Sequence, residues 1–273
     1  MDRKYSLAHL TVLGCPPSEM AYIAAMTGYD YISIRPILMG LPGEPNYCLA
    51  ENKEMLRQTK RAITSTGIGV NDIELARIFD GVDIKCYEPA IEVAAELGAK
   101  SVLSSIWTPN KEMYTEKFAE LCDLAKSYGI NVELEFVTWA SVSNLAEAKE
   151  VLDTVQKSNA GIMIDTLHFN RSRVTLEELS LIPKEWFHFV HVCDGPKEIP
   201  TTKEELIYTG RDARLYIGEG GINIAEILDA IPPVVYSIEL PHLVRVRELG
   251  YAEHARRCIE SAKNYFNNHS IYK

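Results

Sequence analysis

The hydrophobic pattern along the chain changes period repeatedly. Short runs rich in β-branched and aromatic residues, typical of buried strands, recur eight times, and each is followed by a stretch with the spacing of an amphipathic helix. The expected strands are 5–13, 29–37, 67–76, 99–107, 130–136, 160–169, 187–195 and 233–241. Alternating strands and helices of this kind form parallel sheets, because the chain must cross over before it can start the next parallel strand.

The expected helices have recognisable ends. Four of them stop at a glycine that can adopt the left-handed conformation of a helix C-terminus, namely Gly28, Gly67, Gly98 and Gly129. The stretches 80–86 and 196–221 are expected to be loops, and the second is long enough to work as a lid or a binding loop. Eight strand–helix units in 273 residues fit a closed barrel better than an open sheet. The sequence therefore predicts one α/β domain over 1–273, a single (β/α)8 TIM barrel.

Composition argues against several classes of protein. Apolar residues make up 47% of the chain, enough for a large core, and the net charge of −10 without a basic patch argues against a nucleic-acid partner. The six cysteines are scattered with no C-x-x-C pair, as expected for reduced thiols. The start lacks the pattern of a secretory signal, and no apolar run approaches the roughly 18 residues of a membrane span. We expect a cytoplasmic protein without a membrane partner.

The last four expected strands each end in a side chain that can bind a metal. These residues are Glu135, Asp165, His191 and Glu239. The carboxyl ends of barrel strands meet at one face, where active sites form. Three carboxylates and an imidazole would repel one another there unless a cation lay among them. Oxygen ligands with one imidazole suit Mn²⁺, Mg²⁺, Co²⁺ or Zn²⁺, so the pattern predicts one divalent metal.

Each of these residues alone has a simpler interpretation. A single histidine in an apolar strand is more often a hydrogen-bonded core residue, and an aspartate after a strand often caps the next turn. Four such residues at equivalent positions of consecutive units favour the metal site. Glu133 faces the same side of its strand as Glu135, one layer lower, which leaves either glutamate open as the ligand. We favour Glu135, because it lies nearer the end of the strand.

Several segments carry a family resemblance. They are "SLAHLTVLG", "VELEF", "IDTLHFNRS", "HVCDGP", "RLYIGEGGINI" and "SIELP". In this order they resemble the xylose isomerase-like TIM-barrel superfamily, in particular the sugar phosphate isomerase/epimerase branch with inosose dehydratases, tagatose-type epimerases and hydroxypyruvate isomerases. The resemblance covers nearly the whole barrel but is not specific to one reaction. Endonuclease IV, a remoter member, uses further histidines and aspartates on a basic surface, which this acidic chain lacks.

The resemblance implies roles for individual residues. The four strand-end residues would be the metal ligands, and two of them, Glu135 and Glu239, would serve as the acid/base pair. His168 resembles the histidine of the family's D-x-x-H element, which lies behind the metal or contacts substrate. Arg214 and Glu219 resemble the loop segment that reaches over the substrate.

Residues that follow the first strands would set the size of the substrate. Arg35 could bind a phosphate or carboxylate, or form a salt bridge at the barrel rim. Trp107 could stack on the apolar face of a sugar or pack in the rim, and Trp139 invites the same two interpretations. Glu74, after the third expected strand, is a further candidate.

The reaction expected from this resemblance starts with an enediolate. The leading hypothesis is a divalent-metal-dependent isomerase or epimerase of a small sugar, keto-sugar or sugar derivative. The alternative is a dehydratase of a keto-polyol or dehydroshikimate-like compound, in which His168 or Asp194 would protonate the leaving hydroxyl. A third hypothesis is a barrel that binds metal without catalysis. The expected partner is a carbohydrate-like small molecule, and the final amphipathic helix leaves room for a homo-oligomer.

Overall fold

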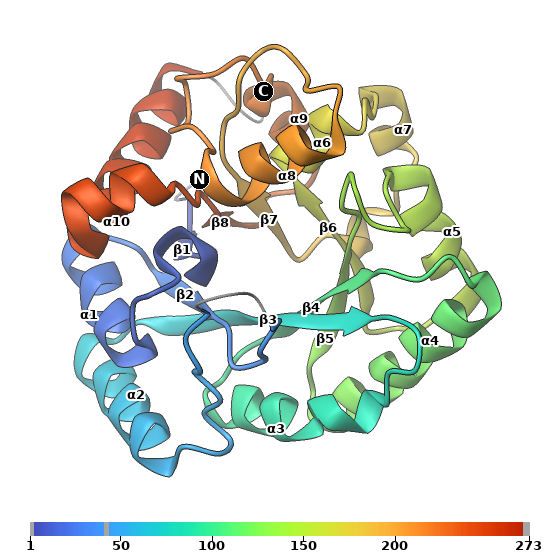
Figure 1. Cartoon of the computed structure of the whole chain (residues 1–273), viewed down its shortest axis with the longest axis horizontal. Coiled ribbons are helices and arrows are strands. Elements are labelled where there is room, and N and C mark those ends of the chain that lie inside the picture. Colours follow the sequence, from blue (N-terminus) through green and yellow to red (C-terminus); the bar gives the residue numbers. More distant parts are fainter. Residues whose placement is uncertain (1–2, 41–43, 270–273) are drawn as a thin grey trace.

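The strands of the molecule close into a barrel. The computed structural model describes residues 3–40 and 44–269. The strands are β1 Tyr5–Leu7, β2 Tyr31–Ile34, β3 Gly69–Ile78, β4 Ser101–Ile106, β5 Asn131–Glu135, β6 Ala160–Asp165, β7 Phe189–Val192 and β8 Val235–Ile238. They pair in parallel in chain order, and β8 pairs with β1. Figure 1 looks down this barrel, with the helices around it. The predicted (β/α)8 architecture is confirmed.

The helices cover the outside of the barrel and one end of it. They are α1 Pro17–Thr27, α2 Lys53–Thr66, α3 Glu88–Glu96, α4 Lys111–Ser127, α5 Leu145–Val155, α6 Thr166–Arg171, α7 Leu176–Ser180, α8 Lys203–Asp212, α9 Ile224–Asp229 and α10 Leu243–Asn268. Asparagines begin three of them, because the side chains of Asn52, Asn110 and Asn144 accept backbone N–H groups of the first turn. Within the described part of the chain, no helix combines the length and apolar character needed to cross a membrane.

The apolar residues form two separate cores. The larger lies between the barrel and the surrounding helices. The smaller fills the barrel interior with Leu75, Leu103, Met163 and Phe189. Leu75 and Leu103 line the cavity at one end of the barrel, and Phe189 lines a cavity at the other end. This plug therefore closes the floor beneath the polar groups at the carboxyl ends of the strands.

Several expected strands ran past the observed ends, and two of them included residues of the helix that follows. The run 160–169 stops being a strand after Asp165, because this side chain accepts the backbone N–H groups of Leu167 and His168 and so begins α6. The run 5–13 likewise includes a 3-10 helix over His9–Val12. Apolar content alone does not separate a buried strand from the buried turn that follows it.

The segments expected to be loops contain helical structure. The stretch 196–221 includes α8, whose N-terminus is capped by Thr202. The stretch 80–86 overlaps a 3-10 helix at Ile84–Tyr87, capped by Asp83. Figure 1 shows α8 lying over the end of the barrel rather than beside it. The long connection is thus an ordered cover for the site.

Candidate metal centre

The four strand-end residues meet at the carboxyl end of the barrel. Glu135 and Asp165 are the last residues of β5 and β6, His191 lies in β7, and Glu239 directly follows β8. One potential ligand atom of each lies within 4.8 Å of those of the other three, and all four residues are buried. The structure thus assembles the cluster that the strand ends predicted.

The charges in this cluster are not balanced by its own members. Burial, then the nearby Glu239 and Asp165 carboxylates, raise the pKa of Glu135 well above its usual range. Burial opposes ionisation of Glu239 too, but His191 and Arg214 together hold the pKa of that carboxyl below its ordinary value. Burial would lower the pKa of His191, yet Glu239 above all raises it to about 10.

The donor atoms of the cluster fit a divalent cation. The two ring nitrogens of His191 are buried and have no hydrogen-bond partner among the residues that the structure describes, and Nδ1 lies 3.4 Å from Glu239 Oε2. An imidazole nitrogen and three carboxylates within one small volume form the ligand set of a divalent metal with mixed oxygen and nitrogen ligands. The residues Glu135, Asp165, His191 and Glu239 could therefore hold such an ion.

Arg214 lies against this cluster rather than only above it. Its Nη1 donates to Asp165 Oδ2 at 2.6 Å, and its Nη2 lies 2.8 Å from Glu239 Oε2. Nε donates to the carbonyl oxygen of Gly210 at 2.8 Å, which ties the guanidinium to α8. Arg214 thus supplies a fixed positive charge beside two of the four residues while it also lines the cavity above them.

His168 presents one defined nitrogen to the cavity. The backbone N–H of Thr138 donates to His168 Nδ1 at 3.3 Å, and the Thr138 hydroxyl lies 3.0 Å from the same atom. Burial lowers the pKa of His168 to about 4, so the ring is neutral at pH 7. Because Nδ1 accepts a backbone hydrogen bond, the proton of the neutral ring lies on Nε2. His168 is therefore a hydrogen-bond donor to a molecule in the cavity.

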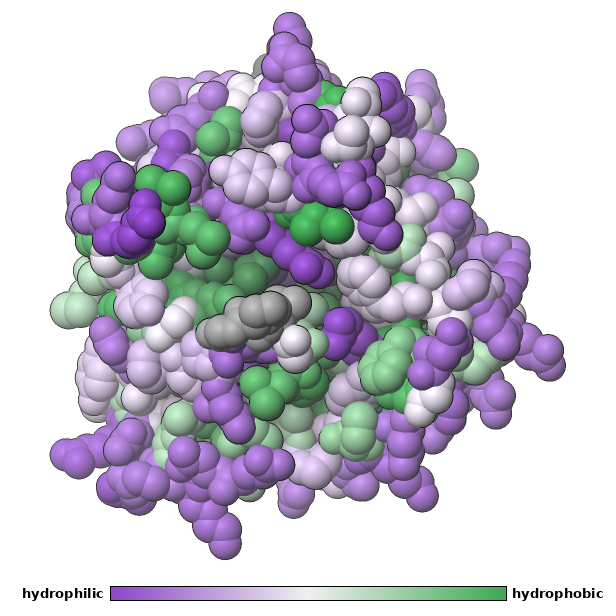
Figure 2. Space-filling model, viewed as in Figure 1, coloured by the Kyte–Doolittle hydropathy of each residue, from purple (hydrophilic) through white to green (hydrophobic). Residues whose placement is uncertain are grey.

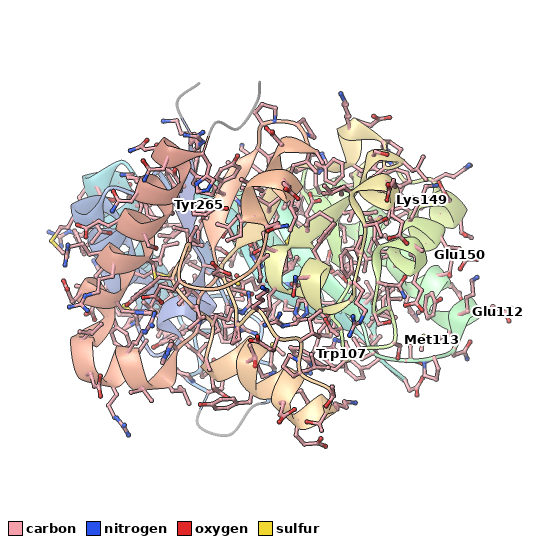
Figure 3. The ribbon with its side chains drawn as sticks, turned by 90° about the horizontal axis from the view of Figure 1, so that it is seen from above. Trp107, Glu112, Met113, Lys149, Glu150 and Tyr265 are labelled. Atoms are coloured by element: carbon pink, nitrogen blue, oxygen red, sulfur yellow. The ribbon has the colours of Figure 1, made fainter. Side chains whose placement is uncertain are left out.

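A cavity of about 820 Å³ lies above the cluster. The predicted site residues that line it are Arg35, Glu74, Trp107, Glu135, Trp139, His168, Arg214 and Glu239. In Figure 3, a view from the side of the barrel, Trp107 lies towards the lower edge and Tyr265 towards the opposite one. Figure 2 looks onto the end that carries α8, where hydrophilic residues dominate the outer edge. This volume suits a small-molecule ligand.

Asp194 is buried but does not line this cavity. Its two carboxylate oxygens accept the backbone N–H groups of Gly195, Gly218, Gly220 and Ile222 at 2.8–3.1 Å. This carboxylate therefore holds the loop between α8 and α9 in place. The expectation that Asp194 contacts substrate or protonates a leaving group does not agree with this position, since its acceptor sites are already occupied.

Glu219 is also outside the cavity lining. Its Oε2 accepts the N–H of Tyr216 at 3.1 Å and pairs with Arg245 at 2.9 Å, and its side chain is 44% exposed. The structure thus places Glu219 on the outer surface of the loop, in contrast to its expected reach over the substrate. The arginine of the same motif, Arg214, does face the cavity.

Glu133 points to the opposite end of the barrel. Its Oε1 accepts the hydroxyl of Ser101 at 2.9 Å and lies 2.8 Å from His188 Nδ1. The hydrogen bond from His188 to this carboxylate raises the pKa of that histidine. Of the two glutamates that the sequence left open, Glu135 is the member of the cluster.

A second acidic group lies beside His191. The sequence interpretation named one of its members, Glu74, as a residue that sets the size of the substrate, and missed the other, Asp72. Asp72 and Glu74 of β3 have ligand atoms within 4.8 Å of one another and of a ring nitrogen of His191. The hydroxyl of Ser33 lies 2.6 Å from Asp72 Oδ2 and 2.8 Å from Glu74 Oε1. One hydroxyl proton cannot be donated fully to both, and burial above all raises the pKa of both carboxyls. Their spacing on one strand face was the available signal, although both precede the true strand end at Ile78.

The chain is similar in sequence to curated enzymes over most of its length. Inosose isomerase of Bacillus velezensis is 24% identical over 234 residues, which cover 78% of this chain and 79% of that protein. The 3-dehydroshikimate dehydratase of Pseudomonas aeruginosa is 22% identical over 248 residues, which cover 85% of this chain and 36% of that longer protein.

Solved structures share the same architecture. One described as the IOLI protein with a binding zinc atom matches with a TM-score of 0.81 at 21% identity, over 98% of this chain and 99% of that chain. A family model described as "Xylose isomerase-like TIM barrel" matches residues 21–261. The chain therefore belongs to the xylose isomerase-like TIM barrel family.

Proposed function

We propose that this protein is a divalent-metal-dependent isomerase or epimerase of a small sugar, keto-sugar or sugar derivative. The observation that carries this proposal is the buried cluster of Glu135, Asp165, His191 and Glu239 at the floor of the cavity. The similarity to inosose isomerase and to a zinc-containing structure supports it. Mn²⁺, Mg²⁺, Co²⁺ and Zn²⁺ all suit the ligand types.

Two carboxyl groups of the cluster can move a proton. Glu135 is the last residue of β5, and Glu239 directly follows β8. Because β6 and β7 lie between these strands in the barrel, the two carboxyl groups approach a molecule in the cavity from different directions. One takes the proton from the carbon next to a carbonyl group, which leaves an enediolate, and the same or the other carboxyl returns it. Return at the neighbouring carbon isomerises the substrate, and return on the opposite face epimerises it.

The other polar groups orient the substrate. The proton on His168 Nε2 is donated to a substrate oxygen, and Arg214 adds positive charge beside the reacting atoms. A divalent metal, when bound, polarises the carbonyl and hydroxyl oxygens and so acidifies the C–H bond between them. The raised pKa of Glu135 suits a group that must hold a proton between two steps.

A dehydratase is the second candidate, favoured by the similarity to 3-dehydroshikimate dehydratase. The first proton removal is the same, but the intermediate then expels a β-hydroxyl group. His168 lines the cavity and can donate a hydrogen bond to that hydroxyl, whereas Asp194 does not line it. The proton that leaves with the hydroxyl as water is the one that a carboxyl of the cluster removed in the first step. Loss of water distinguishes this outcome from isomerisation.

The test is deuterium uptake from heavy water by keto-sugars and keto-polyols, followed by mass spectrometry with the metal-loaded protein. We expect uptake with the wild type and a loss of roughly 10² to 10⁴-fold in Glu135→Gln and Glu239→Gln, the range for removal of a general acid or base. The control is Glu219→Gln, which changes a carboxylate outside the cavity. Uptake with loss of water would favour the dehydratase. Metal binding without uptake by any compound would favour a barrel without catalysis.

A further inference from the structure

Two arginines face the cavity from different elements. Arg35 follows β2 directly, and Arg211 lies in the last turn of α8, which covers the end of the barrel (Figure 1). Arg35 is only 6% exposed, and its Nε has no hydrogen-bond partner among the described residues. A buried guanidinium with an unused donor is costly unless a ligand satisfies it.

The acidic groups near Arg35 leave its Nε without a hydrogen bond. Glu74 forms an ion pair with Nε at 3.7 Å, longer than a hydrogen bond, and also contacts the Ser33 hydroxyl that it shares with Asp72. Glu74 is itself buried beside other polar groups, with ligand atoms of Asp72 and His191 within 4.8 Å. Glu44, also in the cavity wall, accepts the backbone N–H of Met39 with both oxygens.

Arg211 adds a second positive charge to the same side. It is half-buried, and in the part of the chain that the structure describes no side chain forms a hydrogen bond or ion pair with it. Burial, followed by repulsion from Arg35, lowers the pKa of Arg211, whereas the adjacent Asp212 partly offsets this. Both guanidinium groups line the same cavity, so a molecule bound there lies near two positive charges.

The position of Arg211 is fixed by its neighbours. A Cβ atom on Gly210 would lie 2.4 Å from the ring of Trp139, so only glycine lets α8 approach this closely. The carbonyl of Gly210 accepts the Nε of Arg214 at 2.8 Å. The end of α8 is thus held over the cavity by an aromatic contact and by an arginine that also touches the metal cluster.

We propose that Arg35 and Arg211 form an anion subsite, so that the substrate carries a carboxylate or phosphate group next to its reacting hydroxy-carbonyl part. Guanidinium groups match both anions with paired N–H donors. This inference rests on the proposed function, because it adds a substrate class to the same cavity. Neutral sugars would offer Arg35 and Arg211 no negative charge.

The experiment compares three matched ketoses on the metal-loaded protein by calorimetry. The probes are D-fructose, D-fructose 6-phosphate and D-fructuronate, which differ only at the sixth carbon. We expect one charged probe to bind at least roughly tenfold more tightly than D-fructose, the scale of a charge-assisted hydrogen bond. Preference for the phosphate ester assigns a phosphate subsite, and preference for the uronate assigns a carboxylate subsite.

Variants separate this subsite from general electrostatics. Arg35→Gln and Arg211→Gln should each remove most of the preference, and Arg211→Gln, at a half-buried surface position, tests the idea if Arg35→Gln fails to fold. Arg247→Gln is the control, because Arg247 lines the cavity but is exposed. Equal affinities for the three probes, or no binding of either charged probe at millimolar concentration, would overturn the proposal. Binding is measured without turnover, so this result is independent of deuterium uptake.

Discussion

Single buried carboxyl groups determine the chemistry at the barrel mouth. Glu135, Asp165 and Glu239 could be predicted from the sequence as cluster members, because each stands at a strand end where a parallel barrel exposes its active site. Asp72 was missed, although it shares a strand face with Glu74, because it lies inside the long strand β3 and away from the end of that strand. The contact of Arg214 with Asp165 could not be predicted from the sequence, because 49 residues separate the two.

For a single residue, we predict that Glu74 makes the free energy of unfolding depend on pH. Its pKa rises from 4.5 in the unfolded chain to about 7 in the folded protein, mainly through burial. The folded state then binds the proton more tightly, so the associated stability is fully present below pH 4.5 and is lost as pH rises through 7. Relative to Glu74→Gln, the metal-free wild type should lose on the order of 3 kcal/mol over this interval.

Urea unfolding at pH 5 and pH 8 with a chelator present measures this difference. The control variant Glu219→Gln should keep the wild-type pH dependence, because that side chain is largely exposed to solvent. If the unfolding free energy of the wild type and of Glu74→Gln depended on pH in the same way, the raised pKa of Glu74 would be refuted.

At the scale of elements, the periodic segments were predictable and their ends were not. Helices that stop at glycine were located well: Gly28 and Gly67 both have the positive φ that ends a helix. The short helix α6 was missed because Asp165 is at once the last residue of a strand and the cap of the helix that follows. The capping signal at Thr202, with glutamates in the first turn, would have revealed α8.

The loop between α8 and α9 depends on one carboxylate. In Asp194→Asn, an amide nitrogen would face two of the four backbone N–H groups that the carboxylate now accepts. Charged hydrogen bonds contribute roughly 1.5–3 kcal/mol each, so we expect a loss of about 3 kcal/mol or more in the free energy of unfolding. Denaturant unfolding measures it, with Glu219→Gln of the same loop as the control.

Metal affinity should change little in Asp194→Asn, since its carboxylate lies outside the four-residue cluster. Wild-type stability combined with loss of substrate binding would contradict this structural role. That result would restore the substrate contact that the sequence suggested.

At the scale of the whole molecule, closure of the barrel creates the site. The four residues of the metal cluster come from β5 to β8. Asp72 and Glu74 come from β3, and Arg35 follows β2, on the other side of the barrel. An apolar plug below them excludes water and strengthens each charge interaction. The local pattern predicted the eight strand–helix units. It could not predict which distant side chains lie in the same layer of the barrel, because that depends on the register between strands in the closed sheet.

The most direct test of the account is metal binding by matched glutamate variants. Glu133 and Glu135 are both buried in β5, but only Glu135 belongs to the cluster. Metal content after exposure to Mn²⁺ or Zn²⁺ and dialysis should be about one ion per chain in the wild type and in Glu133→Gln, and strongly reduced in Glu135→Gln and Asp165→Asn. A wild type that retains no metal, or undiminished binding in both cluster variants, would contradict the proposed site.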